Sequence, residues 1–247
     1  MYISKSSLGA FLQCPRRFQY NYIDKIKSPS SPQAERGIAV HEFCNRFYDN
    51  IKFRNGRFIV DEGFLSDTLN TATPDAKLCM ENFIEFEFKR WDACKVLNPL
   101  NPKKLFMPLL RESKFFSDKL EQVTIVDRLD QRLDGNYTLV EYKSERFQPK
   151  GWKLTELRRE LCFEKTTCET SPEFMNLYPN NILDFVVYFP RSNDIIMEGF
   201  NWRSMKALQN AIEKMRLAVE LKDYPCNVNY HCRYCSYNLS CNMEMSS

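Results

Sequence analysis

Three cysteines near the end of the chain, Cys232, Cys235 and Cys241, have the spacing C-x2-C-x5-C. Thiolates at this spacing bind zinc or an iron–sulfur cluster, and either centre needs four ligands. Two cysteines could supply the fourth ligand: the nearby Cys226, or Cys14 close to the N-terminus. Cys226 would complete a local site, for which zinc is the natural metal, whereas Cys14 would join the two ends of the chain and favour a [4Fe–4S] cluster. The spacing alone slightly favours the local zinc site.

Acidic residues and a lysine in the middle of the chain could form a second, oxygen-rich metal site. Asp127 and the sequence Glu141-Tyr142-Lys143 lie on either side of a turn. Because alternate residues of a strand share a face, Glu141 and Lys143 project together, and a hairpin would bring Asp127 beside them. Carboxylates are hard ligands for Mg²⁺ or Mn²⁺, and a lysine there can neutralise charge on a reacting phosphate. A Glu-x-Lys strand is more commonly a solvated face, but apolar neighbours indicate that this one is partly buried.

Two further residues could complete this oxygen-rich site. Glu112 lies on the preceding candidate strand, and His41 lies early in an amphipathic helix. Imidazole can complete a metal shell beside two carboxylates. A lone histidine more commonly caps or flanks a helix, so only its combination with the hairpin favours a ligand role.

Periodicity and turn signals predict the elements that must position these residues. Helices are predicted at residues 6–13, from Pro15 onward, on an apolar face from Val40 to Ile51, and at about 75–96, 154–165 and 203–221. Strands are predicted at residues 108–116, 123–132, 137–144, 182–189 and 195–200. Asp134-Gly135-Asn136 has hairpin-turn chemistry. This order predicts a single α/β domain with helices before and after a sheet.

Length and composition set the remaining bounds. The 247 residues suffice for one large domain, and the net charge of +3 neither requires nor opposes nucleic-acid binding. There is no apolar run of membrane-spanning length and no signal peptide pattern, so we expect a cytoplasmic protein. In that compartment, ten cysteines are better explained as metal ligands and buried thiols than as disulfides.

Together, the motifs resemble those of the RecB-like nucleases of the PD-(D/E)XK superfamily. In chain order they are Cys14-Pro15-Arg16-Arg17-Phe18, Gly37-x3-His41, Asp127, Glu141-x-Lys143 and the C-x2-C-x5-C tail. The chain is most similar to the CRISPR-associated Cas-four family, and AddB nuclease domains and exonuclease V share the plan. The resemblance extends from Cys14 to Cys241.

The resemblance implies a central mixed sheet flanked by helices, with the N- and C-terminal segments joined at a metal cluster. One nuclease domain would cover residues 1–247, with a helical region at about 36–100, a catalytic sheet core at about 105–200, and a cluster region formed by 1–25 and 222–247. It implies that the divalent-metal ligands are His41, Asp127, Glu141 and the carbonyl of Tyr142, and that Lys143 is catalytic. It implies that the [4Fe–4S] ligands are Cys14, Cys232, Cys235 and Cys241, and not Cys226.

The resemblance further implies an exonuclease that cuts single-stranded DNA with Mg²⁺ or Mn²⁺, in CRISPR adaptation or DNA repair. Other CRISPR adaptation proteins and a second copy of the chain are candidate partners, and no membrane is expected. Two other functions stay open: a non-catalytic DNA-binding adaptor on the same fold, and a zinc-stapled structural protein. The complete set of Asp127, Glu141 and Lys143 favours the nuclease.

The chain departs from the family pattern at several positions. Val126 replaces the proline of the superfamily's name, and Thr124 stands where a glycine is common. Glu160 and Glu164 stand where the family has its Gln-x3-Tyr helix. Arginines could contact phosphate instead, and the candidates are Arg16, Arg17, Arg158 and Arg159. The rings of Phe18, Tyr20 and Tyr22 belong either to a single-strand groove or, more commonly for such a pattern, to a helical core.

Overall fold

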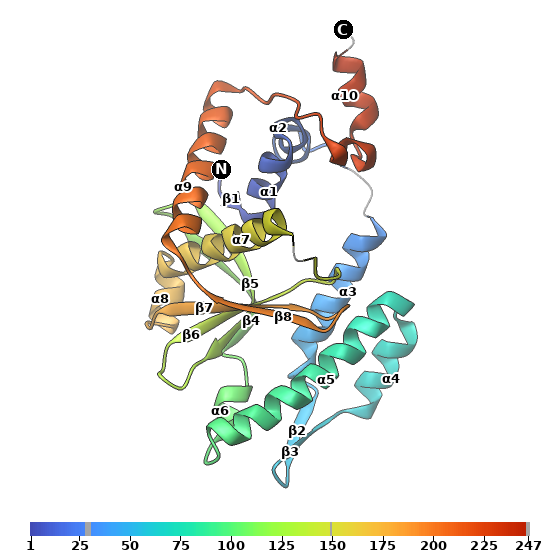
Figure 1. Ribbon diagram of the computed structural model, residues 1–247, viewed down its shortest axis with the longest axis vertical. Coiled ribbons are helices and arrows are strands. Elements are labelled where there is room, and N and C mark those ends of the chain that lie inside the picture. Colours follow the sequence, from blue (N-terminus) through green and yellow to red (C-terminus); the bar gives the residue numbers. More distant parts are fainter. Residues whose placement is uncertain (28–30, 149, 246–247) are drawn as a thin grey trace.

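The computed structural model describes residues 1–27, 31–148 and 150–245, and at its centre is a mixed sheet (Figure 1). The six strands of the sheet are β1 (Ile3–Ser4), β4 (Leu110–Ser117), β5 (Gln122–Gln131), β6 (Tyr137–Tyr142), β7 (Ile182–Phe189) and β8 (Asp194–Gly199). Their order is β1-β5-β6-β7-β8, with β4 on the other edge of β5. The predicted central mixed sheet is therefore confirmed.

The predicted hairpin between β5 and β6 is present. The two strands pair antiparallel from Arg128–Val140 to Gln131–Tyr137. Gly135 has a φ of +86° in the turn, a value that favours glycine, and the Arg132 N–H donates to the Asn136 carbonyl at 2.9 Å. This closed turn fixes the register that sets Asp127 against the end of β6.

Helices cover both faces of the sheet (Figure 1). On one face, α3 (Pro32–Phe47) and α5 (Pro74–Leu97) pack against Val140, Tyr142 and Tyr188. On the other face, α7 (Gly151–Glu169) packs against Leu139 and Val187. An outer layer of α1 (Lys5–Gln13), α2 (Pro15–Phe18) and α9 (Trp202–Leu221) packs on α7. Side chains of β6 thus alternate between the two helical layers, as predicted for a buried strand.

The region at 36–100 is not wholly helical, which corrects the prediction. The helix predicted to continue to Ile51 ends at Phe47, and Ile51 begins a hairpin of β2 (Ile51–Arg54) and β3 (Arg57–Val60). Asn55 and Gly56 form its turn, and both have positive φ. Asn-Gly is a common pair in hairpin turns, but the helical spacing of the apolar residues before it favoured a helix. The remaining short elements were not predicted, and they are a π-helix (Gln19–Ile23), α4 (Glu62–Thr71), α6 (Pro102–Phe106), α8 (Pro172–Leu177), a 3-10 helix (Tyr230–Tyr234) and α10 (Asn238–Met245).

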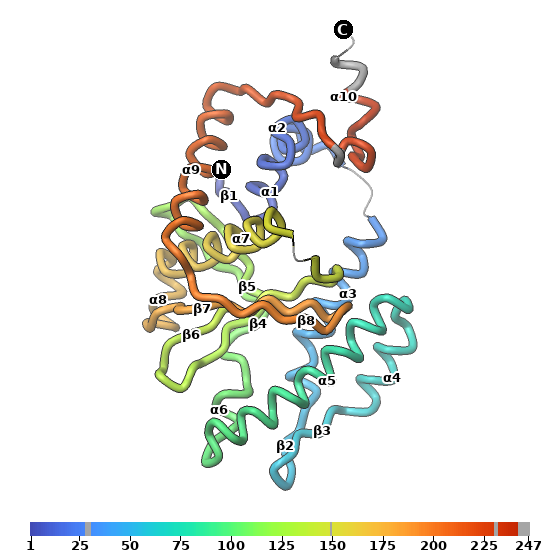
Figure 2. The backbone as a smooth tube through the Cα atoms, in the orientation of Figure 1, coloured from blue at the N-terminus to red at the C-terminus, as the bar shows by residue number. Residues whose placement is uncertain are grey.

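The C-terminal tail after α9 lies beside α1 and α2 (Figure 2). The Asn227 side chain donates to the Gln13 carbonyl at 3.1 Å, and Tyr237 donates to the Ile26 carbonyl at 2.9 Å. These contacts bring the cysteine-rich tail against α1 and α2. In the described ranges, no helix is long and apolar enough to cross a membrane.

Candidate active site

The site lies where β5 and β6 part. Their ladder ends at the Arg128–Val140 pair, and β1 joins the same edge of β5 only at Gln122 and Val123. At this opening the Tyr142 N–H donates to Asp127 Oδ2 at 2.9 Å. The Asp127 carboxylate thus accepts the hydrogen bond that a carbonyl of β5 would accept if the ladder continued. Asp127 is thereby held rigidly at the end of the hairpin, beside Glu141.

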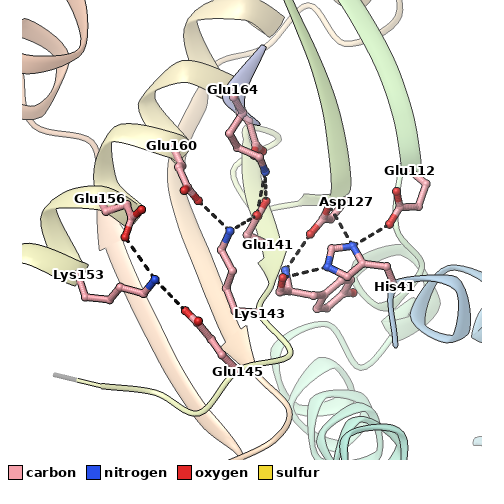
Figure 3. A network of polar contacts seen from close by, with 12 residues as sticks. His41, Glu112, Asp127, Glu141, Lys143, Glu145, Lys153, Glu156, Glu160 and Glu164 are labelled. Atoms are coloured by element: carbon pink, nitrogen blue, oxygen red, sulfur yellow. Dashed lines mark hydrogen bonds and ion pairs between the residues drawn. The ribbon is translucent and has the colours of Figure 1, made fainter. Parts of the chain in front are cut away.

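His41 joins this opening from α3 (Figure 3). Its Nδ1 lies 3.2 Å from Glu112 Oε1 and 3.5 Å from Asp127 Oδ1, and its Nε2 lies 3.1 Å from the Tyr142 carbonyl oxygen. One ligand atom from each of His41, Glu112 and Asp127 falls within 4.8 Å of the others. Two carboxylates and an imidazole at this separation fit a divalent ion such as Mn²⁺ or Mg²⁺. The Tyr142 carbonyl lies against the other ring nitrogen of His41, Nε2.

Glu112 reaches the site through an unusual backbone conformation. It is opposite Asp127, but the β4–β5 ladder skips this pair, and Glu112 has a φ of +42°. A non-glycine residue in this region costs about 1–3 kcal/mol and is most common at functional sites. The hairpin pattern placed Glu112 only on a neighbouring strand, because no sequence signal marks a positive φ at a glutamate.

Glu141 lies beside this trio but is held by two lysines. Lys5 Nζ lies 2.8 Å from both Glu141 oxygens, and Lys143 Nζ lies 2.8 Å from Oε1. Lys143 also contacts Glu160 Oε2 of α7 at 2.8 Å, and Lys5 contacts Glu164. Burial by itself would raise the pKa of Glu141, but the ammonium groups of Lys143 and Lys5 hold it well below its usual range. The part played by Lys5 was not foreseen.

The surroundings of the trio raise the pKa of both His41 and Asp127. Burial by itself would lower the pKa of His41, but hydrogen bonds with Asp127 and Glu112 outweigh it and raise the pKa to about 10. Burial, and then the nearby Glu141, raise the pKa of Asp127. A ligating imidazole must be neutral, so a divalent ion bound to these three side chains would displace a proton from the trio.

Comparison with known proteins identifies the family of the chain. The family described as the PD-(D/E)XK nuclease superfamily matches residues 2–163. The chain belongs to the PD-(D/E)XK nuclease superfamily. The match includes every residue of the site from Lys5 to Glu160 and ends before Glu164 and the cysteine-rich tail.

A solved structure described as a "putative exonuclease" from Eubacterium rectale shares 10% identity with this nuclease. The alignment covers 94% of this chain and 87% of that one, with a TM-score of 0.49. None of the curated proteins matches the chain.

Two adjoining clefts lead to the candidate active site. The first has a volume of about 820 Å³ and contains the trio, and the second has a volume of about 830 Å³. Lys5, Lys143 and Lys153 line both. The second cleft runs past Trp152 toward α1 and Asn227, so basic side chains extend from the active site toward the cysteine-rich tail.

The four arginines proposed from the sequence lie in different surroundings. Arg17 and Arg159 line the second cleft, and Arg16 and Arg17 line the cysteine cavity. Arg158 lines neither the second cleft nor the cysteine cavity, and it donates two hydrogen bonds to Glu198, at 2.6 and 2.7 Å. The proposed aromatic groove is also divided, since Phe18 and Tyr20 are buried core residues and Tyr22 lines the second cleft.

The cysteines of the two termini line one small cavity of about 90 Å³, and they are Cys14, Cys226, Cys232, Cys235 and Cys241. The Asn227 N–H donates to Cys14 Sγ at 3.4 Å, and Cys226 Sγ lies 3.2 Å from Cys241 Sγ. Among the described residues, no three of these sulfurs lie within 4.8 Å of one another. A single tetrahedral zinc ion needs sulfurs about 3.8 Å apart, given Zn–S bonds of about 2.3 Å. The other cysteines are buried: Cys44, Cys79, Cys94, Cys162 and Cys168.

A buried ion network lies next to the candidate active site, around Arg128 of β5. Arg128 donates to Glu87 at 2.9 Å and to the Tyr142 hydroxyl at 3.2 Å, and it also pairs with Asp130. Arg128 and Glu87 are almost fully buried. The network therefore anchors β5 and β6 next to Asp127.

We expect Arg128→Ala to lower the free energy of unfolding by about 3 kcal/mol, the lower end of the range for breaking a buried ion pair, because Glu87 loses one of its two buried cations and keeps Arg90 at 2.8 Å. Chemical denaturation of the purified protein measures this. Arg132→Ala is the control, since the Arg132 ion pairs are partly exposed and should be worth about 1 kcal/mol or less. Equal losses in the two variants would refute the anchoring role of Arg128.

Proposed function

We propose that this protein hydrolyses phosphodiester bonds in DNA, with a divalent metal ion held by His41, Glu112 and Asp127. The observation that carries the proposal is the convergence of these three side chains, beside the Glu141–Lys143 pair, in a member of a nuclease superfamily. The resemblance adds Glu141 as a further ligand. Its carboxylate lies beside Asp127, and one of its oxygens would contact the same ion.

The chemistry follows from the residues in place. When bound, the ion would polarise the scissile phosphate and lower the pKa of the attacking water. Lys143 would place its ammonium group beside the phosphate and neutralise the charge that develops there. Glu141 and Glu160 fix that ammonium group from two sides. The Tyr142 carbonyl holds Nε2 of His41 and so keeps Nδ1 turned toward Asp127 and Glu112.

The proposed substrate is single-stranded DNA, cut from an end. The RecB-like motifs support this, and so does the depth of the site, because Asp127 and Glu141 are only 6% and 2% exposed. A flexible strand can reach such recessed carboxylates more easily than a stiff duplex. The second cleft, with Arg17, Arg159 and Trp152, offers cations and a ring along the path of that strand.

The test is incubation of purified protein with end-labelled DNA in Mn²⁺, with and without chelator. We expect linear single strands to be shortened, blunt duplex to be cut more slowly, and a circular single strand to resist. Cleavage of the circle at the linear rate would replace the exonuclease with an endonuclease. Equal rates on linear single strand and duplex would refute the strand preference.

Binding to the strand should depend steeply on salt, because backbone phosphates supply most of the affinity. Each phosphate contact contributes a slope of about −0.7 in log affinity against log salt. We expect Arg159→Ala to reduce the slope by about that amount. The neighbouring Arg158→Ala should leave the slope unchanged, because Glu198 already occupies its guanidinium group. Fluorescence anisotropy measures the slopes of both variants, with Ca²⁺ in place of the catalytic ion to limit cleavage. A smaller slope for Arg158→Ala than for Arg159→Ala would show that the strand does not follow the second cleft.

We also propose a [4Fe–4S] cluster held by Cys14, Cys232, Cys235 and Cys241. The common cavity supports it, because it brings Cys14 to the cysteines of the C-terminal tail. Its role would be to fasten the C-terminal tail to α1 and α2, at the far end of the second cleft. Cys226 lies in the same cavity and is the alternative ligand.

A further inference from the structure

Lys5 is the feature of the active site that neither the motifs nor the proposed chemistry uses. It is the first residue of α1 and directly follows β1, whose pairing with β5 brings it to the opening between β5 and β6. Ser4 caps α1 and fixes the direction in which the helix leaves the sheet. The side chain of Lys5 therefore enters the site from the N-terminal segment, far in sequence from every other member.

The ammonium group of Lys5 links two buried carboxylates. It lies 2.8 Å from each oxygen of Glu141 and also pairs with Glu164 of α7. Glu141 is 2% exposed, and Glu164 is fully buried. A cation stabilises negative charge on two carboxyl groups in such a place, since burying that charge uncompensated would be costly. The two carboxyl groups also interact directly with each other, so Glu141, Glu164 and the Lys5 ammonium group form one buried cluster.

The surroundings resemble one half of a two-metal site. In two-metal nucleases the ions lie about 3.5–4 Å apart, and a shared carboxylate commonly lies between them. Here the trio of His41, Glu112 and Asp127 can hold one ion. Glu141 lies beside that trio, and on its other side, where a second ion would bind, stands the ammonium group of Lys5.

We propose that Lys5 is a built-in cation that takes the place of a second divalent ion, so that this chain binds a single metal ion in its active site. The inference rests on the proposed function, because it assumes that the trio binds a metal. Lys5 acts as a positioning residue through Glu141. It supplies fixed positive charge on the side of Glu141 that faces α7, and it competes with any ion for the Glu141–Glu164 pair.

The experiment counts Mn²⁺ ions without DNA, by calorimetry and by the electron paramagnetic resonance signal of free Mn²⁺. We expect the wild-type protein to bind about one ion per chain and Lys5→Ala to bind about two, as a two-metal site does. Lys5→Arg keeps the cation and should bind one. The double variant Lys5→Ala/Glu164→Gln removes an acidic group together with the cation, so it should again bind one Mn²⁺ ion per chain.

Lys153→Ala is the matched control, because Lys153 lines the same clefts and also pairs with two glutamates, Glu145 and Glu156. Those carboxylates are partly exposed, so this variant should still bind one ion. Circular dichroism confirms that each variant is folded. If the wild type binds one ion and Lys5→Ala also binds one, the inference fails while the proposed function stands. Two ions in the wild type would likewise overturn it, and no binding at all would overturn the proposed function.

Discussion

Replacing Asp127, Glu141 or Lys143 with alanine is expected to lower the rate of DNA cleavage by at least about 10²- to 10³-fold, the range found when one preorganised charge-stabilising group is removed. Asp127 belongs to the metal trio, and Lys143, directly after β6, lies 2.8 Å from Glu141. His41→Ala should slow cleavage less, because Glu112 and Asp127 remain as ligands. Single-turnover cleavage of labelled single strands in Mn²⁺ measures each rate.

Loss of fold must be separated from loss of chemistry in these variants. Thermal unfolding shows whether each protein retains its structure. Glu213→Ala on the exposed face of α9 is the control for removing a carboxylate far from the clefts, and it should cleave at the wild-type rate. A folded Glu141→Ala protein that cuts as fast as the wild type would show that the site is wrongly assigned.

Replacing Cys14 with serine is expected to remove the iron and to destabilise the protein about as much as Cys235→Ser. A cluster that joins Cys14 to the tail closes a very long loop, and its binding free energy contributes to folding. Both ends of the chain should then come loose together. Iron analysis of protein purified without oxygen, with limited proteolysis of the tail, measures this.

Cys226→Ser is the matched control for the cluster. Its sulfur lies in the same cavity, 3.2 Å from Cys241, but the RecB-like pattern does not include it, so iron content should be preserved. Stoichiometric zinc without iron, together with normal metal content in Cys14→Ser, would instead establish the local zinc site.

The hairpin at the centre of the site could be predicted because its signals are local. Alternation along β6 places Leu139 on the α7 face and Val140 on the α5 face, and Asp134-Gly135-Asn136 marks the turn. The strand boundaries deviate from the prediction by one or two residues at most positions, as expected where strand ends fray. The Asn55-Gly56 turn carried an equally clear signal, but the apolar positions before it also fit a helix.

The contacts that complete the site could not be predicted from patterns. Lys5 and Glu141 are 136 residues apart, and only the parallel pairing of the two-residue strand β1 with β5 brings them together. Such a short strand has no periodicity to detect. Glu160 and Glu164 were recognised as departures from the Gln-x3-Tyr helix, but their lysine partners depend on how α7 crosses the sheet.

The most direct test of the central claim, a metal ion acting on the phosphodiester bond, uses a single strand with one sulfur-substituted phosphate. Sulfur binds Mg²⁺ poorly and binds the softer Mn²⁺ or Cd²⁺ better. We expect the substitution, in one of its two stereoisomers, to block cleavage at that phosphate in Mg²⁺ and to permit it again in Mn²⁺ or Cd²⁺. Equal slowing with every ion, or cleavage that persists in chelator, would contradict the account.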